Sequence, residues 1–311
     1  MKNIRENLLV SLAMLFLALG CGAKPDPYGQ QVQKADAYAQ KGEDWLSQGD
    51  FKKAERDFTK GLNLSRSVDY RRGAAAQLNN LGAVALEQGD LPKARELFTQ
   101  AFEINRETAN WTDAATNLAN LATVAQKAKD PAGAARHLAL AEDAARRAEN
   151  KAALGQVYCR LAGFSLDQGD QARARQYLEQ AQGLAASELK GLLHYQWGRL
   201  LFASGNSSQA LEHLHQALAA DKENLDRAAM AADLTLLGEV HQARGEWDQS
   251  FSAFERAFDV YAALGKKAAA QACRGRLSTV NTQGRLGRSL ERFENHPLLT
   301  PAKKASSSTK S

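Results

Sequence analysis

A short turn recurs along the chain at near-constant spacing and constrains its fold more than any other feature. The six occurrences are Gln48-Gly49-Asp50, Gln88-Gly89-Asp90, Lys129-Asp130, Gln168-Gly169-Asp170, Gly205-Asn206 and Gly245-Glu246. Measured from the first, the steps are 40, 40, 40, 36 and 40 residues. Self-similarity with such a period is typical of stacked repeats, in which each unit packs on the next. The sequence therefore predicts a repeat array, and so a binding scaffold, rather than one globular core.

Each unit carries the pattern of two amphipathic helices. In the second unit the apolar and small positions are Leu78, Leu81, Gly82 and Ala85 before the turn and Ala94, Phe98, Ala101 and Phe102 after it. Steps of three, four and seven place these residues on one face of each helix, and the turn folds the two helices into an antiparallel pair. Gly82 and Ala94 are small where the helices cross, while Leu81 and Phe98 fill the space beside them. We therefore expect an all-α fold.

The pattern resembles the tetratricopeptide repeat, whose first helix carries Leu-Gly and whose second carries Ala-x₃-Phe, as in Leu81-Gly82 and Ala94 to Phe98. The long step and the run Asn79-Asn80-Leu81-Gly82 resemble the 40-residue repeats of the kinesin-light-chain-like subgroup. The resemblance implies a right-handed superhelical solenoid over residues 34–295, with about six repeats. A degenerate seventh unit, from about Ala268 and rich in arginine, is expected to cap the C-terminal end.

The N-terminus has the pattern of an export signal. Lys2 and Arg5 precede an apolar run over residues 8–19 that is too short to span a bilayer core of about 30 Å. Residues 17–21, Leu-Ala-Leu-Gly-Cys, resemble the lipobox of bacterial lipoproteins. The resemblance implies a signal peptide at residues 1–20 and lipidation of Cys21, and Gly22 after it favours the outer membrane over the inner one. A plain signal peptide cleaved elsewhere is the alternative.

Two segments outside the repeats are expected to lack regular structure. Residues 21–33 contain Pro25, Pro27 and Gly29, which predict a flexible tether after the lipidated cysteine. Residues 296–311 are basic and rich in serine, with too little apolar content to repay ordering, and are expected to form a disordered tail.

Composition argues against several classes of function. The net charge of +5 falls to +4 without residues 1–20, and no basic block with interleaved aromatics predicts nucleic-acid binding. His213 and His215 are two apart, so on a helix they do not share a face for a metal. No catalytic motif occurs, and Cys159 and Cys273 are almost three repeats apart and expected to be free. We expect no enzyme, no cofactor and no small-molecule substrate.

The family resemblance implies that the first helices line a concave groove that binds a partner. The groove residues carried over in this way are Asn79, Asn80, Asn120, Arg160, Tyr195, Gln196, Arg199, Phe202 and Glu239. Asparagine amides can pair with an extended peptide backbone, and Arg160 and Arg199 can each fork onto a carboxylate. Tyr195 and Phe202 would supply an aromatic shelf. The alternative is that the asparagines bond to their own repeat's backbone and that the arginines are only solvated.

These features together predict a lipid-anchored scaffold on the periplasmic side of the cell envelope that binds a protein or an extended peptide. Within this prediction, a pilotin-like assembly factor, a scaffold that recruits envelope hydrolases, and a peptide-responsive sensor stay open. The irregular 36-residue step lies between Gly169 and Gly205, beside Arg160, Tyr195 and Arg199. That region is where we expect the partner to bind.

Overall fold

The computed structural model describes residues 26–184 and 189–299, which form helices joined by short turns, with no β-strand among them. The helices are α2 (Pro27–Ser47), α3 (Phe51–Ser67), α4 (Arg71–Gln88), α5 (Leu91–Glu107), α6 (Trp111–Lys127), α7 (Pro131–Arg147), α8 (Lys151–Asp167), α9 (Gln171–Leu184), α10 (Lys190–Ala203), α11 (Ser207–Glu223), α12 (Arg227–Ala243), α13 (Trp247–Ala263), α14 (Lys267–Gln283) and α15 (Glu291–Glu294). The expected signal peptide, Cys21 and most of the C-terminal tail lie outside the described residues.

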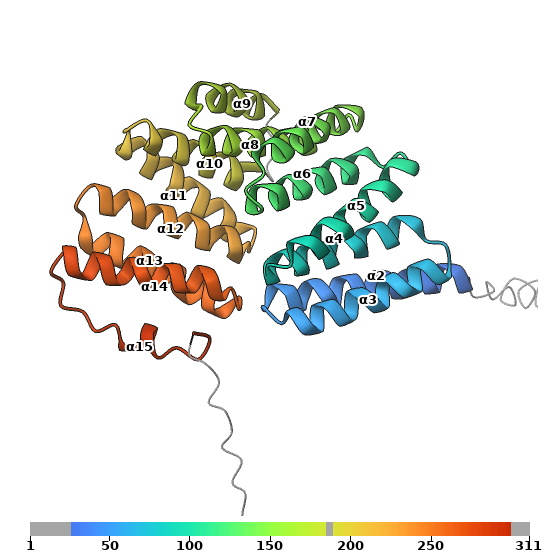
Figure 1. Cartoon of the computed structure of the whole chain (residues 1–311), viewed down its shortest axis with the longest axis horizontal. Helices are drawn as coiled ribbons and strands as arrows, with labels where there is room; N and C mark the ends of the chain where they lie inside the picture. The colour runs from blue at the N-terminus through green and yellow to red at the C-terminus, as the bar shows by residue number, and fades with distance from the viewer. Residues whose placement is uncertain (1–25, 185–188, 300–311) are drawn as a thin grey trace, which may run out of the picture.

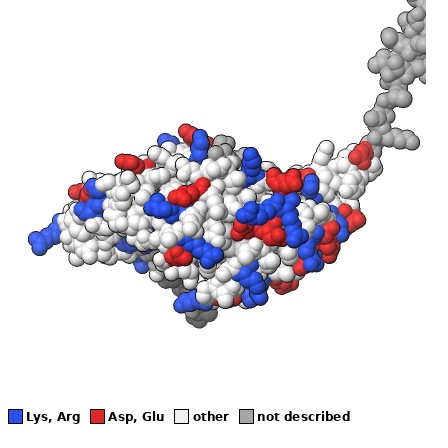
Figure 2. Space-filling model, turned by 90° about the horizontal axis from the view of Figure 1, so that it is seen from above, with Lys and Arg blue, Asp and Glu red and all other residues white. Residues whose placement is uncertain are grey.

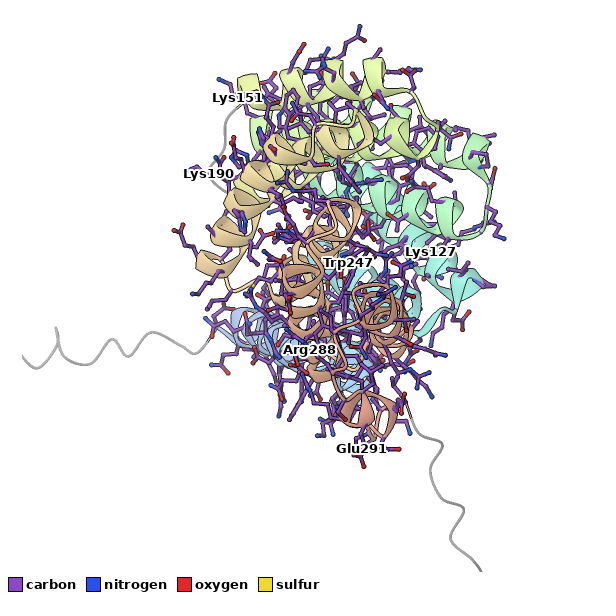
Figure 3. The ribbon with its side chains drawn as sticks, turned by 90° about the vertical axis from the view of Figure 1, so that its left-hand side faces the viewer. Lys127, Lys151, Lys190, Trp247, Arg288 and Glu291 are labelled. Carbon is purple, nitrogen blue, oxygen red and sulfur yellow. The ribbon has the colours of Figure 1, made fainter. Side chains whose placement is uncertain are left out.

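Consecutive helices pack as antiparallel pairs, from α2 with α3 to α12 with α13, and the pairs stack into a curved array (Figure 1). The all-α solenoid of six repeats is confirmed, and α14 and α15 form the degenerate unit after it. In the view of Figure 3, Lys151 and Lys190, which begin α8 and α10, lie on the same side of the array, and Glu291 marks α15 at its far end. No helix within residues 26–184 or 189–299 is long and apolar enough to cross a membrane.

The recurring turn has two separate functions, one for each residue type in it. Gly49 and Gly89 adopt φ of +76° and +80°, in the left-handed region that ends a helix and that glycine reaches without strain. The aspartate that follows caps the next helix, since the side chains of Asp50 and Asp90 each accept a hydrogen bond of 3.1 Å from a backbone N–H three residues on. The Gly-Asp turn therefore ends one helix and begins its partner.

Small residues in the first helix of a unit accept large ones from the second, as expected. A Cβ placed on Gly82 would lie 2.7 Å from the Phe98 ring, and one on Gly238 would lie 2.7 Å from the Phe254 ring. Both phenylalanines are fully buried. The close approach of the paired helices thus depends on the absence of a side chain at the glycine.

The irregular step coincides with a shorter helix. α10 contains 14 residues, whereas α8 and α11 contain 17, and α9 is described as far as Leu184. The unit boundary between α9 and α10 therefore differs from the others in the array.

The predicted boundaries of the solenoid are wrong by a few residues at both ends. Helix α2 begins at Pro27, inside the expected tether over residues 21–33. Proline suits the first turn of a helix, because its missing N–H has no partner to lose there and its φ is already helical. At the other end, Leu298 and Leu299 pack against the C-terminal core, so the tail does not begin at residue 296.

The first and last units of the superhelix contact each other, which the sequence reasoning did not foresee. The turn between α2 and α3 meets the turn between α13 and α14, where a Cβ placed on Gly265 would lie 3.0 Å from the carbonyl oxygen of Gly49. Beside it, Lys266 Nζ lies 2.9 Å from Glu87 Oε1. The expectation that each repeat touches only its neighbours is therefore wrong, because the curvature brings the two ends of the array side by side (Figure 1).

Candidate functional site

The predicted asparagines form an amide network that links the first helices of successive units. Asn79 Oδ1 accepts hydrogen bonds from Asn117 Nδ2 at 3.0 Å and from Asn120 Nδ2 at 2.9 Å. Asn80 Nδ2 donates to Glu43 Oε1 at 3.3 Å. The three predicted asparagines are half-buried and bond to side chains of neighbouring units, not to the backbone of their own. They therefore hold the register between α2, α4 and α6 while facing the inner side of the array.

Arg199 and Gln196 also bridge two units. Arg199 Nη2 lies 2.6 Å from Asp167 Oδ1, and its Nη1 donates to Gln196 Oε1 at 3.1 Å. Gln196 is buried. The guanidinium thus joins α8 to α10. The sequence predicts that Arg199 binds a ligand carboxylate, and such a carboxylate would compete with Asp167 for the same guanidinium group.

Phe202 and Glu239, which were also predicted to line the groove, belong neither to the amide network nor to the Arg199 ion pair. The half-buried Phe202 packs against the C-terminal core. Glu239 forms an ion pair with Arg276 of α14. The structure does not bring either residue to the cavity described next.

Arg160 and Tyr195 share a cavity of about 510 Å³ between α8, α10, α11 and α12. Arg160 is exposed to solvent there, and the walls around it lower the pKa of its guanidinium by limiting its hydration. Tyr195 is half-buried, and burial raises the pKa of its hydroxyl group. The cavity lies beside the irregular unit boundary, in the region where the sequence predicts the partner.

Two buried aspartates that sequence reasoning missed line the same cavity. Asp221 and Asp233 are only 6% and 1% exposed, and apart from the carboxyl group of Asp221 no described residue forms a hydrogen bond with the carboxyl oxygens of Asp233. Burial, then the neighbouring carboxyl group of Asp221, raises the pKa of Asp233 to about 8. Burial also raises the pKa of Asp221. The pair therefore holds a proton at neutral pH.

A glycine makes room for this pair. A Cβ placed on Gly191, in the first turn of α10, would lie 1.8 Å from Asp221 Oδ1, so no other residue fits without moving the carboxyl group. The buried Asp221 therefore lies directly against the α10 backbone.

The signal for these aspartates was present in the sequence as a spacing of 12 residues. The pairs at equivalent places of successive unit junctions are Ser65 and Gln77, Asn105 and Asn117, Ala145 and Val157, Asp221 and Asp233, and Tyr261 and Cys273. At the second of these junctions Asn105 Nδ2 donates to Asn117 Oδ1 at 2.8 Å. Two acids at positions that face each other at a buried junction could have been found by aligning the units with one another.

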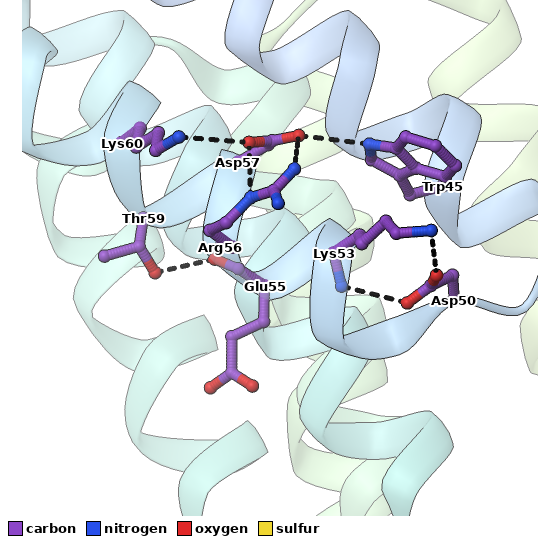
Figure 4. A network of polar contacts seen from close by, with 8 residues as sticks. All are labelled: Trp45, Asp50, Lys53, Glu55, Arg56, Asp57, Thr59 and Lys60. Atoms are coloured by element: carbon purple, nitrogen blue, oxygen red, sulfur yellow. Dashed lines mark hydrogen bonds and ion pairs between the residues drawn. The ribbon is translucent and has the colours of Figure 1, made fainter.

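The first repeat shows how a buried carboxylate is stabilised elsewhere in this chain (Figure 4). Asp57 is 1% exposed, yet its oxygens accept hydrogen bonds from Trp45 Nε1 at 3.1 Å and from Arg56 Nε and Nη2 at 3.0 and 2.9 Å. Arg56 holds the pKa of Asp57 below its usual range. Unlike Asp57, Asp233 forms no ion pair among the described residues.

Other chemistry of the described residues is less specific. On the face shown in Figure 2, positive and negative side chains are interspersed. No group of three or more His, Cys, Asp or Glu residues within 26–184 and 189–299 is arranged to hold a metal ion. Cys159 and Cys273 are free and buried, as predicted, and burial raises the pKa of Cys159 to about 12. Neither thiol has the exposure of a reactive nucleophile.

Comparison with known proteins identifies the type of repeat. Family models described as tetratricopeptide repeat match residues 33–107, 155–188 and 190–263, together more than half of the chain. No curated protein sequence matches the chain.

Several solved structures have a similar fold. Aspartyl phosphate phosphatase F from Bacillus subtilis is 14% identical, with a TM-score of 0.61, and the match covers 94% of this chain and 78% of that one. Apo RapI is 14% identical, with a TM-score of 0.60 and coverage of 85% and 95%. A Rap protein complexed with competence and sporulation factor is 14% identical, with a TM-score of 0.57 and coverage of 82% and 76%. At this identity the similarity establishes the fold alone.

Proposed function

Because the chain belongs to the tetratricopeptide repeat proteins, we propose that it is a non-enzymatic scaffold that binds a protein segment or extended peptide inside its superhelix. Proteins built from this repeat are in general interaction scaffolds, although one structural neighbour is named as a phosphatase. The observation that carries the proposal is the cavity of about 510 Å³ on the inner side of α8, α10 and α12, bounded by α11. Its volume falls within the range of about 300–1,000 Å³ that is usual for ligand sites.

The inner wall offers groups that suit an extended chain. Tyr195 presents an aromatic ring with a polar end, and Arg160 presents several donors to solvent inside the cavity. Asn80 and Asn120 continue the polar surface toward the first units, where half-buried amides can bond to a peptide backbone. This arrangement supports a segment that runs along several units, as proposed for long repeats of the kinesin-light-chain-like type.

Its location is proposed from the lipobox-like residues 17–21. Lipid on Cys21 would anchor the protein at the periplasmic face of the outer membrane, since two or three acyl chains give stable attachment where one is marginal. Because α2 begins at Pro27, residues 22–26 alone separate the anchor from the repeats, a reach of at most about 17 Å at about 3.3 Å per residue. The solenoid would then lie close to the bilayer and assemble or recruit an envelope complex there.

The anchor is tested by cell fractionation. Wild-type protein is expected in the membrane fraction and released only by detergent, whereas Cys21→Ala is expected in the soluble fraction. If Cys21→Ala stayed in the membrane without detergent, the lipoprotein proposal would be wrong.

The binding surface is tested by site-specific photo-crosslinking in intact cells. A photoreactive phenylalanine analogue replaces Tyr195 inside the superhelix, and in a matched strain it replaces Leu140, which is 47% exposed on α7. We expect a discrete crosslinked product from position 195 and none from position 140. The same products from both positions, or products from position 140 only, would contradict binding on the inner side.

A peptide-responsive change of shape is a second candidate, favoured by the contact between the first and last units. The Gly49 and Gly265 turns touch, so any change in superhelical pitch must alter or break this contact. A ligand that spans α8 to α12 and prefers one pitch would therefore shift the population of closed and open forms. Small-angle X-ray scattering with and without a bound peptide tests this: an unchanged radius of gyration would exclude the sensor function.

A further inference from the structure

The junction between α11 and α12 departs from the chemistry of the equivalent junctions. The α5–α6 junction satisfies its two facing residues with an amide hydrogen bond, Asn105 to Asn117. The α7–α8 junction fills the same places with the buried apolar residues Ala145 and Val157. Both solutions are neutral. By contrast, the two carboxyl groups that face each other between α11 and α12 must either carry negative charge or share a proton.

This carboxyl pair costs folding free energy that the α5–α6 and α7–α8 junctions avoid, and unlike the neutral Ser65 and Gln77 of the α3–α4 junction its members can carry charge. An ionised carboxylate moved into a buried site without partners is strongly unfavourable, and two like charges side by side repel each other. Apart from the proton that it shares with Asp221, Asp233 has no hydrogen-bond donor at either oxygen in the described part of the chain. A structural need alone is met at lower cost by an asparagine pair like that of the α5–α6 junction. A ligand that carries the missing positive charge explains why acids occupy these places.

The cavity would bring such a ligand next to the pair. Asp221, Asp226 and Asp233 all line it, against Arg160 as the one basic side chain among its lining residues. The cavity therefore carries more acidic than basic side chains, whereas Arg160 and Arg199 in the sequence had suggested a basic site. Tyr195 lines the same space, where an aromatic ring can cover the aliphatic stem of a long side chain or lie against its cationic end.

We propose that the Asp221–Asp233 pair is the specificity pocket for a lysine or arginine side chain of the bound peptide. The inference rests on the proposed function, in that it requires a peptide on the inner side of α8, α10 and α12. An ammonium or guanidinium group donates several hydrogen bonds, which would satisfy the oxygens of Asp233 and neutralise the pair. Basic peptide chemistry, rather than a metal ion, fits a site with two carboxyl groups and an open cavity above them.

Binding of a cation at this pair is linked to release of a proton. Asp233 is protonated below about pH 8, and a cation beside it stabilises the carboxylate form. The other titratable or charged groups that face Asp233 are Arg160 on α8, Tyr195 on α10, Asp221 on α11, Asp226 at the start of α12 and Tyr261 on α13. Because the proton competes with the cation, affinity for a basic peptide should be higher at pH 8 than at pH 6.

The experiment uses the full chain, immobilised in detergent, and a random library of short peptides whose retained members are sequenced. Because hydrogen bonds to charged groups are among the strongest in proteins, peptides containing lysine or arginine should be enriched about tenfold or more. The enrichment should be lost in the double variant Asp221→Asn, Asp233→Asn, which copies the neutral α5–α6 junction. Thermal unfolding of this variant, expected at or above the wild-type temperature, shows that the loss is not caused by misfolding.

A control variant removes at least as much negative charge elsewhere. Glu103→Gln with Asp143→Asn changes a half-buried and an exposed acid that form ion pairs along α5 and α7. It should keep the full enrichment. If it loses the enrichment as well, long-range charge explains the selectivity and the pocket is excluded.

The remaining outcomes separate the two proposals. Peptides retained without a preference for lysine or arginine would overturn the specificity pocket and leave the scaffold function in place. No retention of any peptide above the level of an uncoated support would contradict the scaffold function, and the pocket with it.

Discussion

Replacement of Gly49 by alanine tests whether the two ends of the superhelix meet in solution. Gly49 has φ of +76°, and a Cβ on it would lie 2.3 Å from the carbonyl oxygen of Leu264 and 2.4 Å from its carbonyl carbon. Gly89 occupies the same turn one unit later, with φ of +80° and nothing within 4 Å of the added Cβ. Gly89→Ala is therefore a matched control with the same backbone strain and no contact across the array.

The magnitudes decide how the protein responds. Alanine in the left-handed region costs about 1 kcal/mol in either variant. The overlap at position 49 is with backbone atoms, so no side-chain rotation relieves it. The ends are held by the partly exposed Lys266–Glu87 ion pair, and such a pair contributes at most about 1 kcal/mol. Opening of the superhelix is thus the less costly response, and the repeats themselves stay folded.

Small-angle X-ray scattering and urea unfolding together test this reasoning. Both variants should lose about 1 kcal/mol of unfolding free energy, but only Gly49→Ala should have a larger radius of gyration than the wild type. Identical scattering from Gly49→Ala and Gly89→Ala would refute the closure of the superhelix.

Three further predictions concern the core, the buried acids and the thiols. Phe98→Ala removes a fully buried ring and should lower the free energy of unfolding by about 3–5 kcal/mol, whereas Leu140→Ala at an exposed position should change it by less than about 0.5 kcal/mol; equal urea midpoints would contradict the packing. Because the folded-state pKa of Asp233 is raised to about 8, its protonation stabilises the protein at low pH and this stability is lost as pH rises toward and through 8. Urea midpoints between pH 5 and 8 should therefore fall more steeply for the wild type than for Asp221→Asn, Asp233→Asn, and parallel curves would count against a shared proton. The thiol of Cys159 should react with an aromatic disulfide reagent only after unfolding, since it is fully buried with a pKa of about 12, and rapid reaction in the folded protein would show an opening that the structure lacks.

The fold could be predicted because its rules are local and repeated. A small residue and a large apolar one recur in each unit at the places of Gly82 and Phe98, and the turn at Gly89-Asp90 both ends one helix and begins the next. Each unit therefore predicts the same pair of helices independently of the others. Pro27 was misjudged because proline either breaks a helix or begins one, and the residues around it do not distinguish the two.

The site was predictable only in its position. Arg160 and Tyr195 line one cavity in the region where the sequence predicts the partner, because groove positions follow from the place of a residue within its unit. The bond from Arg199 to Asp167 joins residues 32 apart, and its formation depends on the side-chain geometry between two units. The contact of Gly49 with Gly265 depends on curvature summed over the whole array, which no single unit encodes.

Amide hydrogen exchange measured on the full chain, with and without a peptide retained from the random library, tests the central claim most directly. We predict slower exchange in α8, α10 and α12, around the cavity that Arg160, Tyr195 and Asp233 line. We predict no change in α5 and α7, which belong to the second-helix layer. Protection confined to α5 or α7, or protection absent from α8, α10 and α12 while the peptide is bound, would contradict binding inside the superhelix.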